Sequence, residues 1–139
     1  MRRLLLAGAA SAALVLAAGC GGPGGSAGGD GGEKEIIIGV IADLTGATGD
    51  VGTPYNEGML AYVDYLNAQG GIKGHKIKAI SEDYAYKVPV AEEKYRKYVS
   101  EGAVAIQGWG TGDSEALRSK VKDDELPFMS ASYAEVLTD

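Results

Sequence analysis

A glycine-rich turn in the second half of the chain carries the residue types best suited to ligand chemistry. The turn, Gly108-Trp-Gly-Thr-Gly112, follows the apolar run 103–106, which predicts a buried strand, and precedes a helix expected to begin near Asp113. Backbone N–H groups of such a turn can face an anionic ligand group, with the positive end of the helix behind them. Its glycines permit close backbone approach, and the Thr111 hydroxyl can donate and accept. The turn predicts a site for the polar head of a small solute, although an unliganded turn between strand and helix remains the alternative.

Composition narrows the function classes. The chain has 139 residues, the size of one domain, with ordinary hydrophobic (45%) and charged (23%) fractions. A net charge of −6 argues against a nucleic-acid surface, which needs clustered Lys and Arg. With a single cysteine, Cys20, and a single histidine, His75, neither an intrachain disulfide nor an ordinary zinc site can be built. We therefore predict no metal, no cofactor and no nucleic-acid partner.

The first residues predict export. Two arginines precede the largely apolar run 4–18, which is short for a membrane span and fits a signal peptide over residues 1–19. Leu16-Ala-Ala-Gly-Cys20 resembles a bacterial lipobox, which implies that Cys20 is lipidated and anchors the protein to the outer face of the cytoplasmic membrane. An ordinary signal peptide that leaves a free thiol is the alternative.

A glycine-rich segment separates this signal from the rest of the chain. Eight of the twelve residues 21–32 are glycine, so this stretch cannot form a core. We expect residues 20–33 to be a lipidated cysteine with a flexible tether, followed by one folded unit at 34–139.

The folded unit alternates predicted strands and helices. The expected strands are 35–42, 76–82, 103–106 and 127–130, and the expected helices are 55–68, 89–101 and 113–125. The run 35–42 is β-branched and apolar on both faces, which predicts a central strand of a parallel sheet, whereas 76–82 alternates weakly and is expected at an edge. The βαβαβαβ order predicts an α/β fold, a doubly wound parallel sheet with helices on both faces. With 35–42 central and 76–82 at an edge, the expected strand order is 2-1-3-4.

Spacing along the helices predicts which side chains face the core. The predicted inner positions are Met59, Tyr62, Val63 and Leu66 in the first helix, Ala91, Tyr95, Tyr98 and Val99 in the second, and Ala116, Leu117 and Val121 in the third.

Ligands of open parallel sheets bind beyond the carboxyl ends of the strands. Three loops are expected there, 43–53, 108–113 and 130–134. They carry the polar and aromatic residues Thr45, Thr48, Trp109, Thr111, Ser130, Ser132 and Tyr133. This convergence favours a ligand site over a purely structural turn.

Residues 34–139 resemble the first lobe of the leucine/isoleucine/valine-binding type of solute-binding proteins, which serve ABC importers. The likeness is carried by Ile38-Gly-Val-Ile-Ala-Asp-Leu-Thr-Gly46, Asn67-Ala-Gln-Gly-Gly-Ile-Lys-Gly74, Glu82-Asp83, the glycine turn, Pro127-Phe-Met-Ser-Ala-Ser132 and Leu137-Thr138-Asp139. This resemblance implies a bilobed trap of the type I periplasmic binding protein fold, of which this sequence would hold only the N-terminal lobe.

The resemblance also implies which residues touch the ligand. Thr111 takes the place of the family's serine or threonine after the third strand, and Ser132 falls near the residue that offers its backbone after the fourth. The family often has Ala-Thr next, where this sequence has Tyr133 and Ala134. The candidate ligand-binding set is Trp109, Gly110, Thr111, Gly112, Ser132 and Tyr133. The implied ligand is a branched-chain amino acid or a related amide, and the implied partners are ABC permease subunits and, through the lipid, the membrane.

Two other functions remain possible. A lipoprotein that presents its ligand to a membrane sensor would use the same lobe. A Rossmann-type enzyme is less favoured, because neither a G-x-G-x-x-G nor a G-x-S-x-G motif occurs in residues 34–139 and His75 lies at the edge opposite the glycine turn. Glu82 and Asp83 are adjacent in a strand and should point to opposite faces. We therefore predict a binding protein and no catalytic residues.

Overall fold

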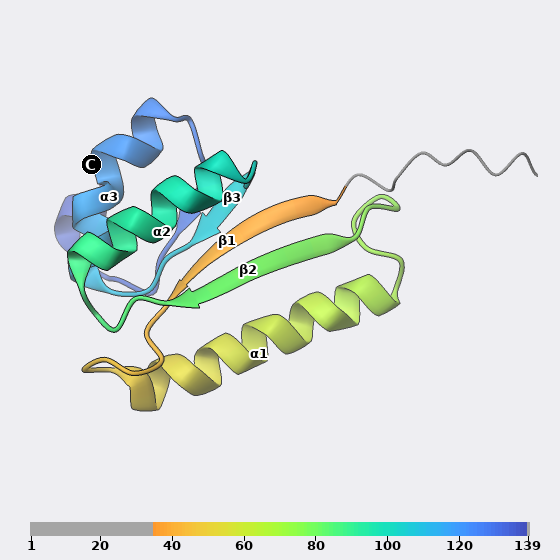
Figure 1. Ribbon diagram of the computed structural model, residues 1–139, viewed down its shortest axis with the longest axis horizontal. Helices are drawn as coiled ribbons and strands as arrows, with labels where there is room; N and C mark the ends of the chain where they lie inside the picture. Colours follow the sequence, from red (N-terminus) through yellow and green to blue (C-terminus); the bar gives the residue numbers. More distant parts are fainter. Residues whose placement is uncertain (1–34, 139) are drawn as a thin grey trace, which may run out of the picture. The chain divides into compact units, whose positions relative to one another are not determined.

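The computed structural model describes residues 35–138, in which strands and helices alternate (Figure 1). The elements are β1 Ile36–Ala42, α1 Gly49–Ala68, β2 Ile77–Asp83, α2 Val88–Ser100, β3 Ala105–Gln107, α3 Thr111–Asp123, β4 Phe128–Met129 and the short 3-10 helix η1 Glu135–Thr138. The predicted signal peptide, Cys20 and the tether lie outside the described residues.

The strands form one parallel sheet in the order β2-β1-β3-β4, as predicted. β1 lies between β2 and β3, with Ile36 opposite Ile77 and Ile38 opposite Ala105. Figure 1 shows α1 on one face of the sheet and α2 and α3 on the other. The β-branched run of β1 is apolar on both faces because both faces are covered.

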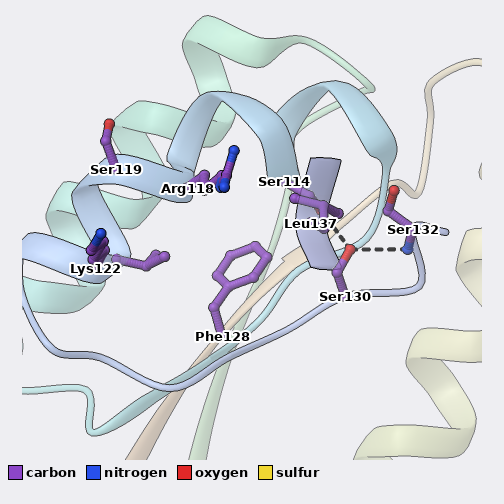
Figure 2. A pocket seen from close by; sticks show the side chains of 9 residues that line it. Ser114, Arg118, Ser119, Lys122, Phe128, Ser130, Ser132 and Leu137 are labelled. Carbon is purple, nitrogen blue, oxygen red and sulfur yellow. Dashed lines mark hydrogen bonds between the residues drawn. The ribbon is translucent and has the colours of Figure 1, made fainter. Parts of the chain in front are cut away.

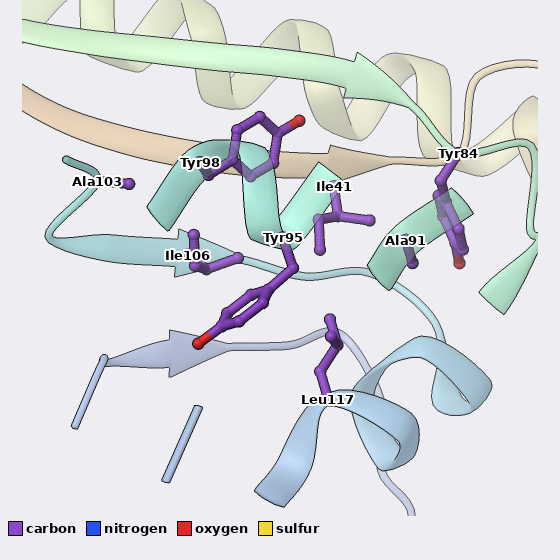
Figure 3. Packing of buried hydrophobic residues seen from close by; sticks show 8 residues of the cluster. All are labelled: Ile41, Tyr84, Ala91, Tyr95, Tyr98, Ala103, Ile106 and Leu117. Carbon is purple, nitrogen blue, oxygen red and sulfur yellow. The ribbon is translucent and has the colours of Figure 1, made fainter. Parts of the chain in front are cut away.

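The main core lies between the sheet and the helices α2 and α3 (Figure 3). Its members are Ile41, Tyr84, Ala91, Tyr95, Tyr98, Ala103, Ile106 and Leu117. The Tyr98 ring packs on β1 where Gly39 has no side chain; a Cβ there would lie 2.4 Å from Tyr98 Cδ2. The Tyr98 hydroxyl donates to the Val40 carbonyl at 2.8 Å, which satisfies the one polar atom of this buried ring.

The start of α1 differs from the prediction. The helix begins at Gly49, six residues before the expected Tyr55, so Pro54 lies inside it rather than at its first turn. The extra turn packs directly on the end of β1, where a Cβ on Gly52 would lie 2.0 Å from the Asp43 carbonyl oxygen. Glycine in this segment therefore allows the helix to pack closely on the strand. The sequence prediction missed this because glycine is more often associated with loops.

One further boundary prediction and two core predictions also change. β3 begins at Ala105 rather than residue 103, because the Ala103 N–H closes the end of α2 by donating to the Tyr98 carbonyl at 2.9 Å. Tyr62 is 61% exposed and Val99 38% exposed, so neither belongs to the core.

Between residues 35 and 138 no helix is both long and apolar enough to cross a membrane.

Candidate functional site

A cavity of about 330 Å³ lies at the carboxyl edge of the sheet. Every strand contributes to it through the segment that follows: β1 through Thr48 and Val51, β2 through Tyr86, β3 through Gly110 and its neighbours, and β4 through Ser132 and its neighbours. The complete lining is Thr48, Val51, Tyr86, Trp109, Gly110, Thr111, Ala131, Ser132 and Tyr133. The convergence expected from the parallel sheet therefore produces a concave surface.

The glycine turn is tighter than predicted, because α3 begins at Thr111 rather than near Asp113 and Gly110 is its N-cap. Asp113, in the first turn of α3, bonds to the residues that precede the helix. Its Oδ2 accepts the N–H of Gly110 at 3.2 Å and that of Trp109 at 3.3 Å. These two N–H groups are therefore bonded within the protein and are not open to a ligand in this structure. The N–H groups of Thr111 and Gly112 remain, for which the first turn of an α-helix provides no acceptor.

Asp113 is a structural carboxylate. It is 1% exposed, and its Oδ1 accepts the Tyr84 hydroxyl at 2.7 Å. Burial raises the pKa of Asp113 above its ordinary value, against the opposing effect of these hydrogen bonds. Burial and the neighbouring carboxylate also raise the pKa of Tyr84, so the phenol keeps the proton that it donates.

Hydroxyl groups join the turn after β3 to the turn after β4. Thr111 Oγ1 lies 3.0 Å from Ser132 Oγ at the cavity. Behind them, Ser114 Oγ lies 2.5 Å from Ser130 Oγ, which in turn accepts the Ser132 N–H at 3.0 Å (Figure 2). The two turns are therefore held in register by four side chains, two of which face the cavity.

Trp109 forms the aromatic wall of the cavity. Its indole N–H donates to Thr48 Oγ1 at 2.8 Å, and its ring lies 5.0 Å from the Tyr55 ring, centroid to centroid, at 52°. Thr48 itself donates to Asp43 Oδ2 at 2.7 Å. Trp109 is thus held by the segment that follows β1, although it lies in the turn after β3.

Five of the six candidate residues line this cavity: Trp109, Gly110, Thr111, Ser132 and Tyr133. Gly112 does not, and an added Cβ there would lie 3.3 Å from Val88 Cγ2. Tyr133 is 98% exposed and stands at the rim. Their roles in binding stay predictions.

Sequence reasoning missed Tyr86, Val51 and Ala131 in the lining. Tyr86 could have been found, because the loop after β2 ends at the same edge of the parallel sheet as the other three. Val51 and Ala131 lie in the loops 43–53 and 130–134 that were expected at this edge, but only the polar and aromatic residues of those loops were selected as candidates.

A larger cavity, of about 670 Å³, lies beside β4 and α3 and shares Ser132 with the first (Figure 2). Its lining includes the basic side chains Arg118 and Lys122 and the apolar side chains Phe128 and Leu137. We place the candidate site in the smaller cavity because only that one is lined from all four strand ends.

The other acidic residues do not form a catalytic pair. Glu82 lies 2.7 Å from Lys94 Nζ and also pairs with Lys97, and these contacts lower its pKa. Asp83 points away from them and accepts the Leu44 N–H at 2.9 Å and the Thr45 hydroxyl at 2.5 Å. Within the part of the chain that the structure describes, no three His, Cys, Asp or Glu side chains are placed to hold a metal ion.

Comparison with known proteins identifies relatives of this chain. The sequence profile of a family described as periplasmic binding protein matches residues 35–139. An amino acid binding protein of Pseudomonas aeruginosa is 32% identical over 91 residues, which cover 65% of this chain and 24% of that protein.

Two solved structures show the same architecture. A substrate-binding protein of an ABC transporter from Aeropyrum pernix is 39% identical and superposes with a TM-score of 0.67 over 72% of this chain and 27% of that one. A branched-chain amino acid transporter substrate-binding protein from Streptococcus pneumoniae, solved in complex with isoleucine, is 27% identical with a TM-score of 0.67, over 71% of this chain and 29% of that one.

These relatives are substrate-binding proteins, not enzymes, which confirms the class and the lobe architecture predicted from the sequence. The chain spans about a quarter of the length of the relatives it matches.

Proposed function

The chain belongs to the periplasmic binding protein family, and we propose on that premise that it captures a small amino-acid-like solute outside the cytoplasm for an ABC importer. The solute is a branched-chain amino acid or a related amide. The described residues supply one wall of the binding site, at the carboxyl edge of the sheet.

The observation that carries the proposal is the cavity into which all four strand ends lead. Thr111 and Ser132 bring two hydroxyl groups within 3.0 Å of each other beside the first turn of α3. Hydroxyls and the adjacent N–H groups can hold the carboxylate of an amino acid or the oxygen of an amide. The relatives named for amino acid binding and for bound isoleucine support this ligand class.

The rest of the lining suits the remainder of such a solute. Among the described residues, none that lines the cavity has an Asp, Glu, Lys, Arg or His side chain. Val51, Trp109 and Tyr133 offer apolar and aromatic surface. A ligand with a short polar head and an uncharged side chain matches this distribution.

The test is a titration of the isotope-labelled chain with L-isoleucine, L-leucine, L-phenylalanine and their amides, followed by amide NMR shifts. We expect the largest shifts at residues 109–112 and 130–133. Thr111→Ala should weaken binding by about 1–3 kcal/mol, roughly 5- to 150-fold, because a polar ligand group loses its partner.

Thr138→Ala is the matched control, because its hydroxyl donates to Glu135 within η1 and does not line the cavity. Equal affinities for wild type and Thr111→Ala would remove Thr111 from the site. Shifts clustered around Phe128 and Leu137 would move the site to the larger cavity.

Membrane attachment is the second part of the proposal, and it rests on Leu16-Ala-Ala-Gly-Cys20. Two or more acyl chains give lasting attachment, since each buried methylene contributes about 0.8 kcal/mol. Cys20→Ser should move the protein from the membrane fraction of the expressing bacteria to the soluble fraction. Incorporation of labelled fatty acid into Cys20→Ser would show that this cysteine is not the acylated residue.

A further inference from the structure

Thr48 connects the interior of the domain to the cavity wall. Its side chain lines the cavity, donates to the buried carboxylate of Asp43 and accepts the indole N–H of Trp109. We infer that Thr48 is the positioning residue of the site, and that it fixes the Trp109 indole so that the ring, rather than the N–H, meets the ligand.

The anchor of this arrangement is Asp43, which is 0% exposed at the end of β1. Its Oδ1 accepts the Gly46 N–H at 2.7 Å, and its Oδ2 accepts both the N–H and the hydroxyl of Thr48, at 2.8 and 2.7 Å. Three hydrogen bonds to one buried carboxylate thus tie Gly46 and Thr48 to the end of β1. The Thr48 hydroxyl therefore has a defined position before any ligand arrives.

The direction of each hydrogen bond follows from the groups involved. A carboxylate accepts, so the Thr48 hydroxyl must donate its one proton to Asp43. An indole N–H only donates, so it finds the remaining lone pair of the same oxygen, at 2.8 Å. The Tyr55 ring, 5.0 Å away, supports the indole through a second contact. The ring is thus held at two points that lie outside its own turn.

This arrangement narrows the class of ligand, and that step rests on the proposed function. Because the only polar atom of the Trp109 side chain is already bonded, the ligand group beside it need not be a hydrogen-bond acceptor. The ring offers apolar surface to an aliphatic or aromatic side chain. Hydrogen bonding to the ligand then comes from Thr111 and Ser132.

Trp109 is the single tryptophan of the chain, so its fluorescence tests the inference without any ligand. In Thr48→Val the indole loses its acceptor, and we expect emission at longer wavelength and stronger quenching by acrylamide. Thr48→Ser keeps the hydroxyl and should restore the wild-type spectrum. Thr45→Val is the matched control, because Thr45 lies in the same loop but donates to Asp83.

A Thr48→Val spectrum and quenching equal to wild type would overturn the inference, as would a Thr48→Ser spectrum displaced as far as that of Thr48→Val. If Thr48→Val does not fold by circular dichroism, the indole Nε1 proton of the wild-type chain decides: slow exchange with solvent supports the bond, and exchange at the rate of a free indole excludes it. Failure of every solute to bind would count against the proposed function and leave these readouts unchanged.

Discussion

Asp113 shows how a residue at the site can serve the fold rather than the ligand. Its carboxylate lies under the turn and takes up the N–H groups of Trp109 and Gly110, together with the Tyr84 hydroxyl. These hydrogen bonds close the turn, and Thr111, the first residue of α3, is left to face the cavity. The polar groups available to a solute are those that Asp113 does not occupy.

We expect Asp113→Ala to lower the free energy of unfolding by about 1–3 kcal/mol, because it leaves buried donors without an acceptor. Glu115→Ala, on the exposed side of the same helix, is the control and should stay within about 0.5 kcal/mol of wild type. Urea unfolding followed by circular dichroism measures both. Indistinguishable midpoints for the two variants would mean that the hydrogen bonds to Asp113 contribute nothing net.

At the scale of the element, α1 is the helix whose limits the sequence misjudged. Gly46, Gly49 and Gly52 are spaced as in an open loop, yet the helix begins at Gly49. Its first turns lie against the end of β1, and Thr53 Oγ1 donates to the Leu44 carbonyl at 3.3 Å. This extra length brings Val51 to the cavity and Tyr55 to Trp109, so the start of α1 is part of the site.

Two glycines inside α1 provide an internal comparison. A Cβ at Gly52 would meet the Asp43 carbonyl oxygen at 2.0 Å, whereas no atom lies within 4 Å of a Cβ at Gly58. Gly52→Ala should therefore destabilise the domain by about 1–3 kcal/mol through overpacking. Gly58→Ala should stabilise it by about 0.5–1 kcal/mol, because alanine loses less backbone entropy in a helix.

Thermal and urea unfolding of both glycine variants measure the difference. Equal stability of Gly52→Ala and Gly58→Ala would show that the first turns of α1 do not pack on β1 as described.

At the scale of the whole domain, two acidic residues near the end of β2 join separate layers. Glu82 pairs with Lys94 and Lys97 of α2, and Asp83 holds the loop after β1 through Leu44 and Thr45. Hydrogen bonds from the two lysines lower the pKa of Glu82. Burial would raise the pKa of Asp83, but hydrogen bonds from Thr45, Leu44 and Ala85 outweigh it and lower the pKa.

These shifts predict an acid-sensitive fold. A carboxyl group whose folded pKa lies below its ordinary value, 4.5 for Glu82 and 3.8 for Asp83, stabilises the fold above that value and loses the contribution as the pH falls through the folded pKa. The raised pKa of Asp113 acts in the opposite sense. We expect urea midpoints to fall as the pH drops below about 4.5, and Glu82→Gln to be less stable at pH 7 with a shallower acid slope. An acid slope as steep in Glu82→Gln as in wild type would contradict the assignment to Glu82.

Local patterning alone determined the order of elements, the parallel sheet and the edge at which a ligand would bind. A β-branched run such as Ile36–Ala42 is apolar on both faces and belongs at the centre of a parallel sheet, whereas the weaker alternation of the next strand belongs at an edge, which together give strand order 2-1-3-4. Five of the six candidate residues lie at the cavity for the same reason, because parallel strands end at one edge.

Only the tertiary structure decided how that edge is built. Hydrogen bonds between residues far apart in sequence determine which N–H and hydroxyl groups remain available to a ligand. Examples are those from Trp109 to Thr48 and from Tyr84 to Asp113. Close backbone contact at Gly52 sets where α1 begins. No periodicity encodes such contacts, because they depend on which side chains the folded sheet brings together.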